Sequence, residues 1–133
     1  ARAVWVPNRN GVLLNIAAAY AESRGLRDVV AGFNREEATT FPDNSRAYMK
    51  AATEAFKFST STRVRVASPT AAYDKTRIAA LGVTHDAPLR TVWSCYTGAK
   101  KMCGLCESCA RLRRALTDAR VPSAMWPRLL PRA

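Results

Sequence analysis

The stretch Asp28-Val29-Val30-Ala31-Gly32-Phe33 decides the fold class. It is short, apolar and without polar alternation, which is typical of a strand buried on both faces of a parallel sheet. Before it, apolar residues from Val12 to Tyr20 recur at helical spacing, and Gly25 stands where a helix commonly ends. A strand that follows a helix in this way is the repeating unit of an α/β domain.

The same reading, extended in both directions, predicts the remaining elements. We expect Asn10 and Ser45 to cap helices and Gly82 to end one. Strands that alternate with helices indicate an α/β domain with parallel strands. Three strands make a small sheet whose edges need cover, so we expect an N-terminal portion to be missing or to come from another chain. The predicted segments are strands at 4–6, 28–33 and 64–67, helices from 12, at 46–58, 74–81 and 110–119, and irregular chain at 34–44 and after 121.

Composition is that of a single folded domain with an excess of positive charge. The 133 residues are 48% hydrophobic, and the formal net charge is +11. Such a charge favours polyanionic partners, but the basic residues are spread along the chain, so we do not expect direct nucleic-acid binding. No apolar run is long enough to cross a membrane and no signal peptide precedes the fold, so we expect a cytoplasmic protein.

All four cysteines fall in one short segment with the spacing C-x7-C-x2-C-x2-C. They are Cys95, Cys103, Cys106 and Cys109. Each C-x2-C turn can place two sulfurs on one tetrahedral ion, so the pattern predicts a structural zinc site with no open position for a substrate. An iron–sulfur cluster and a pair of disulfides are alternatives, and nothing marks the chain as secreted, the setting that disulfides favour.

Around these cysteines the sequence resembles the C-terminal signature of the 7-cyano-7-deazaguanine synthases, the QueC family. Three further segments resemble family motifs in the same order. The four matching segments are Trp93-Ser94-Cys95-Tyr96 with the 103–109 cysteines and 111–115, Val6-Pro7-Asn8-Arg9-Asn10, Gly32-Phe33-Asn34 with Phe41-Pro42-Asp43, and Asp74-Lys75 ahead of Ile78 and Leu81-Gly82.

The resemblance implies a partial adenine-nucleotide α-hydrolase-like (Rossmann-like) fold with a parallel sheet and a C-terminal zinc-binding loop and helix. It also implies an ATP-dependent carbon–nitrogen ligase, with magnesium and ATP as co-substrate. Such an enzyme activates 7-carboxy-7-deazaguanine with ATP, aminates it with ammonia and dehydrates the amide to the nitrile for queuosine or archaeosine. Family members open with a Ser-Gly-Gly-x-Asp-Ser phosphate loop, which does not occur here, so the chain resembles only the C-terminal part of such an enzyme.

Five residues in the matched segments are candidate site residues. Ligands of open α/β sheets bind beyond the carboxyl ends of the strands, where Arg9, Asn10 and Asn34 are expected. We expect Arg9 and Lys75 to stabilise charge during catalysis, and Asn10, Asn34 and Asp43 to bind substrate or cofactor. The alternatives are a surface ion pair for Arg9, a helix cap for Asn10, a turn residue for Asp43 and a solvated lysine for Lys75.

We expect three parts: residues 1–92 from the nucleotide-binding domain, residues 93–120 as the zinc-binding segment and residues 121–133 as a tail. A homodimer is expected, with a missing N-terminal half as a possible partner. Two other functions remain open. One is a related carboxylate-activating enzyme of antiviral defence, and the other is a non-catalytic, zinc-stapled module that binds nucleic acid.

Overall fold

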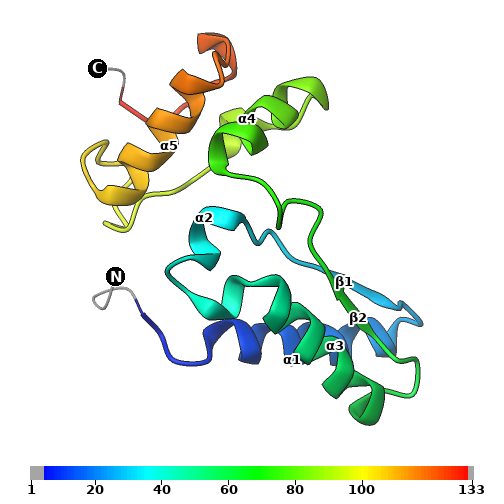
Figure 1. Cartoon of the computed structure of the whole chain (residues 1–133). Coiled ribbons are helices and arrows are strands. Elements are labelled where there is room, and N and C mark those ends of the chain that lie inside the picture. The colour runs from blue at the N-terminus through cyan, green and yellow to red at the C-terminus, as the bar shows by residue number, and fades with distance from the viewer. Residues whose placement is uncertain (1–4, 132–133) are drawn as a thin grey trace. The chain divides into compact units, whose positions relative to one another are not determined.

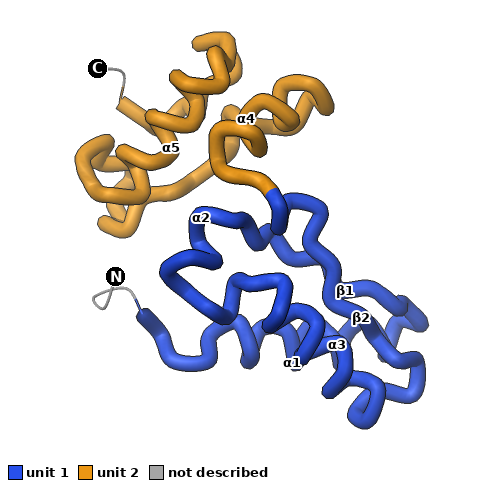
Figure 2. The backbone as a smooth tube through the Cα atoms, in the orientation of Figure 1, with its two compact units in different colours: residues 1–72 blue, residues 73–133 orange. Residues whose placement is uncertain are grey.

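A computed structural model describes residues 5–131 and divides the chain into two compact units (Figure 2). The first comprises residues 1–72 and the second residues 73–133. The expected boundary between residues 92 and 93 falls inside the second unit, because helix α4 packs against helix α5 there. Within the part of the chain described, no helix is long and apolar enough to cross a membrane.

The first unit is an α/β arrangement in which helices alternate with two strands (Figure 1). Its strands pair in parallel, as predicted, with Asp28 opposite Arg65 and Val30 opposite Ala67. In chain order the elements are α1 (Arg9–Ser23), β1 (Asp28–Val30), α2 (Arg35–Ala38), the 3₁₀ turn η2 (Pro42–Asn44), α3 (Arg46–Ser59) and β2 (Arg65–Ala67).

Two helix ends in this unit follow the sequence prediction. Gly25 lies just past α1 with φ of 67°, and the N–H groups of Gly25 and Leu26 donate to the carbonyls of Glu22 and Ala21. This pattern satisfies the last carbonyls of the helix and favours glycine, which adopts positive φ at little cost. Ser45 caps α3, because its side chain accepts a hydrogen bond from the N–H of Tyr48 at 3.1 Å.

The core of the first unit lies between one face of the sheet and the two long helices. Val29 and Val66 point toward it, whereas their strand neighbours on the other face are exposed. The strand expected to be buried on both faces is therefore buried on one, and Val30 is 69% exposed. The buried residues are Leu14, Ala18, Ala21, Phe33, Met49, Phe56 and Val64.

The second unit is built from helices around the cysteine segment. Helices α4 and α5 pack against each other (Figure 1). The tail expected to be irregular contains one 3₁₀ turn and contributes buried side chains, Val121 and Leu130, to the core. The elements are α4 (Lys75–Thr84), η3 (Leu89–Thr91), α5 (Glu107–Asp118) and η4 (Ser123–Met125).

Three predicted elements in the first unit need correction. Trp5 and Val6 are not in a strand, and Val4 lies outside the described residues. Asn10 lies inside α1, whose capping position is Asn8, because the helix begins at Arg9. The segment 34–44 is not irregular throughout, since the side chain of Asn34 caps the short helix α2.

Two predicted elements in the second unit also differ. Gly82 lies within α4 and does not end it. A Cβ at this position would come within 2.9 Å of the Leu89 side chain, so the glycine is explained by packing. The glycine thus permits close packing, which in sequence cannot be told from a helix stop. Helix α5 begins at Glu107, three residues before the predicted start, so Cys109 is inside the helix.

Candidate metal centre and ligand cavity

The four cysteines converge on one point of the second unit. Cys95 directly precedes the loop at residues 96–106, and Cys103 and Cys106 lie in that loop. Cys109 is on the first turn of α5. Their Sγ atoms all lie within 4.8 Å of one another. The cysteines are free thiols, and Cys95 and Cys109 are buried. The structure therefore brings together all four residues that the spacing predicted.

Main-chain N–H groups point at these sulfurs. The N–H of Cys103 donates to Cys95 Sγ at 3.3 Å, and the N–H groups of Leu105 and Cys106 donate to Cys103 Sγ at 3.4 and 3.2 Å. Gly104 makes this turn possible, because it adopts φ of 73°, where other residues are strained. Hydrogen bonds of this kind stabilise negative charge on sulfur, which a metal-bound thiolate carries.

The cluster has an uneven electrostatic environment. The N–H of Cys103, followed by the Thr97 hydroxyl, lowers the pKa of Cys95 to about 6. The N–H of Tyr96 likewise lowers the pKa of Cys106. Burial raises the pKa of Cys109 to about 11. Cys95 is therefore the thiol that ionises most readily, and Cys109 the one that ionises least readily.

The donor set fits a metal ion with four thiolate ligands. A tetrahedral zinc ion with Zn–S bonds of about 2.3 Å requires sulfurs about 3.8 Å apart. The observed separations, all within 4.8 Å, are close to that requirement. Four protein ligands complete the coordination, so a bound ion would hold the loop and α5 together and would leave no position for a substrate.

A cavity of about 630 Å³ lies at the N-terminal ends of α1 and α3 in the first unit. Its size is in the range of small-molecule sites. Aromatic rings of Trp5 and Tyr48 line it together with the polar side chains of Asn8 and Asp43. The full lining comprises Trp5, Asn8, Pro42, Asp43, Ser45, Ala47, Tyr48 and Ala51.

Two of the predicted substrate-binding residues meet at this cavity. Asp43 lines it, and the buried Asn10 side chain donates to the Asp43 carbonyl at 3.4 Å. One Asp43 carboxylate oxygen accepts a hydrogen bond from Asn44 Nδ2 at 3.2 Å. Asn10 therefore holds the Asp43 segment in place. Arg9 begins α1 beside Asn10, with an exposed side chain.

Asn34 is not among the residues that line this cavity, and Lys75 belongs to the other unit. Asn34 is buried, and its side-chain oxygen accepts from the N–H of Glu37 at 3.0 Å, which makes it the cap of α2. Lys75 is the first residue of α4 in the second unit, directly after Asp74, whose side chain caps that helix.

The sequence predicted Asp43 in this cavity but not its aromatic walls or Asn8. Trp5 stacks on Phe41 with ring centroids 5.8 Å apart and planes 5° from parallel. Gly11 leaves room for two side chains that line the cavity. A Cβ at this position would lie 1.9 Å from Asn8 Oδ1 and 2.8 Å from the Tyr48 hydroxyl. The available signal was that each of Trp5 and Phe41 stands just before a candidate ligand loop.

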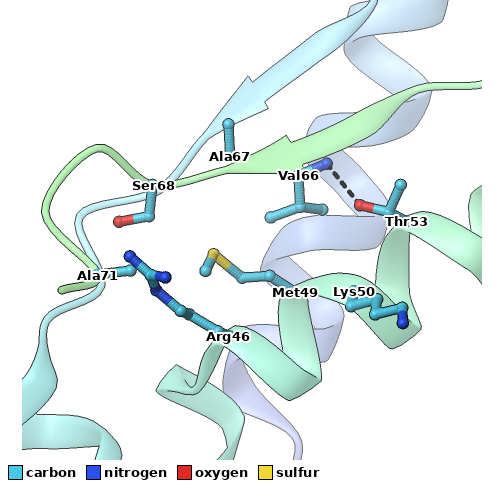
Figure 3. A pocket seen from close by; sticks show the side chains of 8 residues that line it. All are labelled: Arg46, Met49, Lys50, Thr53, Val66, Ala67, Ser68 and Ala71. Carbon is cyan, nitrogen blue, oxygen red and sulfur yellow. Dashed lines mark hydrogen bonds between the residues drawn. The ribbon is translucent and has the colours of Figure 1, made fainter.

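A second, smaller cavity of about 350 Å³ lies between α3 and β2 (Figure 3). Met49, Val66 and Ala71 give it apolar walls, and the Arg46 side chain extends across it toward Ser68. On its far side, the N–H of Val66 donates to the Thr53 hydroxyl at 2.9 Å. None of the predicted site residues lines this cavity.

Comparison with known proteins identifies one family. The family model described as "Queuosine biosynthesis protein QueC" matches residues 1–120. A 7-cyano-7-deazaguanine synthase of Methanosarcina mazei is 51% identical over 129 residues, or 97% of this chain and 56% of the relative. One from Carboxydothermus hydrogenoformans is 56% identical over 112 residues, or 84% and 52%. The chain thus spans about half the length of the curated relatives it matches.

Proposed function

The chain belongs to the QueC family of queuosine biosynthesis proteins, and from this premise we propose that it forms part of a 7-cyano-7-deazaguanine synthase. The observation that carries the proposal is 51% identity over nearly the whole chain to a protein of that name. We propose the adenine-nucleotide α-hydrolase-like fold for the assembled enzyme. ATP, magnesium, ammonia and 7-carboxy-7-deazaguanine are the proposed reactants, and a homodimer the proposed state. Neither relative quoted above is named for antiviral defence or nucleic-acid binding.

The cavity of the first unit is the proposed binding site for the deazaguanine ring. Its aromatic walls, Trp5 and Tyr48, suit a flat heterocycle, and the Asp43 carboxylate can accept hydrogen bonds from the amino and ring N–H groups of a guanine-like base. Asn10 positions the Asp43 main chain through its hydrogen bond. Arg9, exposed at the start of α1, can pair with a carboxylate or phosphate.

The proposed zinc ion is structural. Cys95, Cys103, Cys106 and Cys109 would hold it, and zinc with four thiolates supplies rigidity and no Lewis-acid step. Lys75 and Asn34 remain proposed as site residues of the assembled enzyme. For Asn34 the observed capping bond uses one lone pair of the side-chain oxygen, so the amide nitrogen is the group proposed to serve a ligand.

The proposal is tested by joining this chain to the part of the Methanosarcina mazei relative that it does not match. The joined protein is given 7-carboxy-7-deazaguanine, ATP, magnesium and ammonia, and the nitrile is followed by mass spectrometry. We expect nitrile formation, and no consumption of ATP by this chain alone. Adenylation of a different carboxylate, with this substrate untouched, would refute the assigned reaction.

Site residues are tested in the same joined protein. Asp43→Asn and Arg9→Ala should each lower the rate tens to hundreds of fold, which corresponds to about 2–4 kcal/mol for a lost charge-assisted contact. Glu54→Gln is the matched control, since Glu54 is an exposed carboxylate that, among the residues described, pairs only with Lys57 on α3. Metal content should equal that of the unchanged protein in all three variants. Unchanged rates in the Asp43 and Arg9 variants would remove these residues from the site.

A further inference from the structure

The smaller cavity of the first unit, here called the α3–β2 cavity, reaches the carboxyl end of β2. Ser68, which lines it, directly follows that strand. The hydroxyls of Ser68 and Thr70 donate to the carbonyl of Phe33, just after β1, at 3.0 and 2.7 Å. The loops that follow the two strands are therefore tied together at one carbonyl. Ligands of open α/β sheets bind beyond the carboxyl ends of the strands, so this wall of the cavity has the position of a ligand site.

The main chain of Ser68 supplies a donor on the side that faces α3. The Val66 N–H donates to the Thr53 hydroxyl of α3 at 2.9 Å, a bond that closes the outer edge of β2 to a further strand (Figure 3). Alternate residues of an extended chain direct their main-chain groups to the same side, so the Ser68 N–H also points toward α3. Within residues 5–131, no hydrogen-bond partner is found for this N–H. It is therefore available to a ligand.

Arg46 supplies positive charge from the opposite wall. Its side chain leaves the first turn of α3 and extends across the cavity, past Met49 and Ala71, toward Ser68 (Figure 3). Among the residues that the structure describes, its guanidinium forms no ion pair or hydrogen bond. Lys50 lines the same cavity, and the described lining contains no carboxylate. The cavity therefore carries positive charge that no acidic side chain of its own walls neutralises.

These groups fit a tetrahedral oxyanion better than a planar one. The planar fork of an arginine binds two oxygens of a carboxylate or of a phosphoryl group. A carboxylate bound in this way has no further oxygen for the Ser68 N–H, whereas a phosphoryl group has a third. Main-chain N–H groups are common partners of phosphate oxygens. With a volume of about 350 Å³, the cavity has room for such a group.

The α3–β2 cavity is distinct from the proposed base site. Successive helical residues are rotated by about 100°, so the residues of α3 that line the two cavities lie on opposite faces of the helix. A helix is about 10 Å wide, and a small molecule that stacks against Tyr48 does not reach Arg46 through it. The base site uses Ala47, Tyr48 and Ala51 of α3, and the α3–β2 cavity uses Arg46, Met49, Lys50 and Thr53.

We propose that the Arg46 guanidinium and the Ser68 main-chain N–H form a binding site for a phosphoryl oxyanion. Both free pyrophosphate and a nucleoside triphosphate carry such a group, and the experiment below separates these two sources. The Ser-Gly-Gly-x-Asp-Ser loop, to which the resemblance assigns the phosphates of ATP, does not occur in this chain, so the site is a different one. The proposal rests on the α3–β2 cavity and does not depend on the proposed reaction.

The site is tested by titrating the isotope-labelled chain with pyrophosphate, ATP or acetate and following its main-chain amide signals by NMR. We expect the Ser68 amide signal to shift and saturate with pyrophosphate, because its N–H gains an oxyanion partner. Acetate at the same concentration should leave this signal in place. ATP that binds as tightly as pyrophosphate would identify a nucleotide as the source of the group, and weaker binding of ATP would identify the free anion.

Three variants separate this site from the general positive charge of the chain. Arg46→Gln should weaken pyrophosphate binding roughly tenfold or more, the loss expected for a charge-assisted contact. Arg46→Lys keeps the charge but not the planar fork, so its affinity should lie between the two. Arg27→Gln is the matched control, because Arg27 is also exposed but does not line the cavity, and it should bind like the unchanged chain.

Thermal midpoints equal to that of the unchanged chain would show that the variants are folded. Full binding by Arg46→Gln, equal weakening by Arg27→Gln, or a Ser68 signal that responds equally to acetate would each overturn the proposal. Pyrophosphate binding that depends on Arg46, together with no nitrile formation by the joined protein, would leave the oxyanion site standing and count against the proposed reaction.

Discussion

The first unit buries aliphatic and aromatic side chains between helices and a sheet, whereas the second builds its core around sulfur. Phe56 and Val64 are central in the first. In the second, Cys95 and Cys109 are themselves core residues, in the same cluster as Met102 and Leu116. The cysteine cluster and the core of the second unit are thus one structure, while the proposed ligand cavity of the first unit borders its core at Tyr48. We therefore expect the two units to respond to different perturbations.

Removal of the metal should have the largest effect, and only on the second unit. Structural zinc in small domains contributes about 10–16 kcal/mol of binding free energy, most of which is folding free energy. A chelator, or Cys109→Ser, should therefore abolish amide protection in residues 73–131 while residues 5–72 keep theirs, as measured by hydrogen exchange with mass spectrometry. Leu105→Ala, at an 88% exposed position between two ligands, is the control. Loss of protection in both units would break the comparison.

Phe56→Ala should produce the reverse pattern. Truncation of a buried phenylalanine costs about 3–5 kcal/mol, because the apolar contacts are lost and a cavity remains. The first unit should unfold at lower denaturant concentration, with the metal still bound at one equivalent per chain. Elemental analysis alongside a denaturant titration measures both quantities. Loss of metal from this variant would show that the two cores depend on each other.

Thr53→Val tests the closed edge of β2. The substitution keeps the shape of the side chain but removes the hydroxyl that accepts the Val66 N–H. We expect a loss of about 1 kcal/mol of unfolding free energy, together with an increase in self-association at high concentration as the edge opens. Thr84→Val serves as the comparison, since within residues 5–131 its hydroxyl donates only to the Ala80 carbonyl of the same helix. A variant as stable as the unchanged chain would mean that water replaces the hydroxyl without cost.

The smallest effect is expected where α1 is tied to the turn before β2. Glu22 accepts hydrogen bonds from the side chain and the N–H of Ser61, and these bonds lower the pKa of its carboxyl below the ordinary 4.5. Because the folded-state pKa is depressed, the stabilisation is present above the unfolded-state pKa and is lost as the pH falls through the folded-state value. Ser61→Ala should therefore lower the thermal midpoint slightly at neutral pH and not in strong acid. A difference that persists in acid would assign the effect to packing.

Sequence alone predicted the parallel α/β class, the Ser45 cap, the Gly25 helix end and the convergence of four cysteines. Each of these depends on residues close together in the chain, or on a pairing that local pattern determines. The role of Gly82 was not predictable, because its reason is the Leu89 side chain seven positions away. Trp5 and Tyr48 were missed as cavity walls for the same reason. The burial of β1 on only one face was missed, because the apolar composition of a strand does not show which other elements cover its two faces.

The buried tail of the second unit, residues 121–131, also affects the order in which this unit can fold during synthesis. The Met102 N–H donates to the Leu129 carbonyl at 3.0 Å, and Leu130 is 5% exposed in the same core as Cys95 and Cys109. Translation produces the metal ligands well before it produces these residues, and domains fold as units when their last elements emerge. The four cysteines of a nascent chain can therefore come together while the surrounding core is still unfinished. Closure of that core waits until Leu129 and Leu130 have left the ribosome.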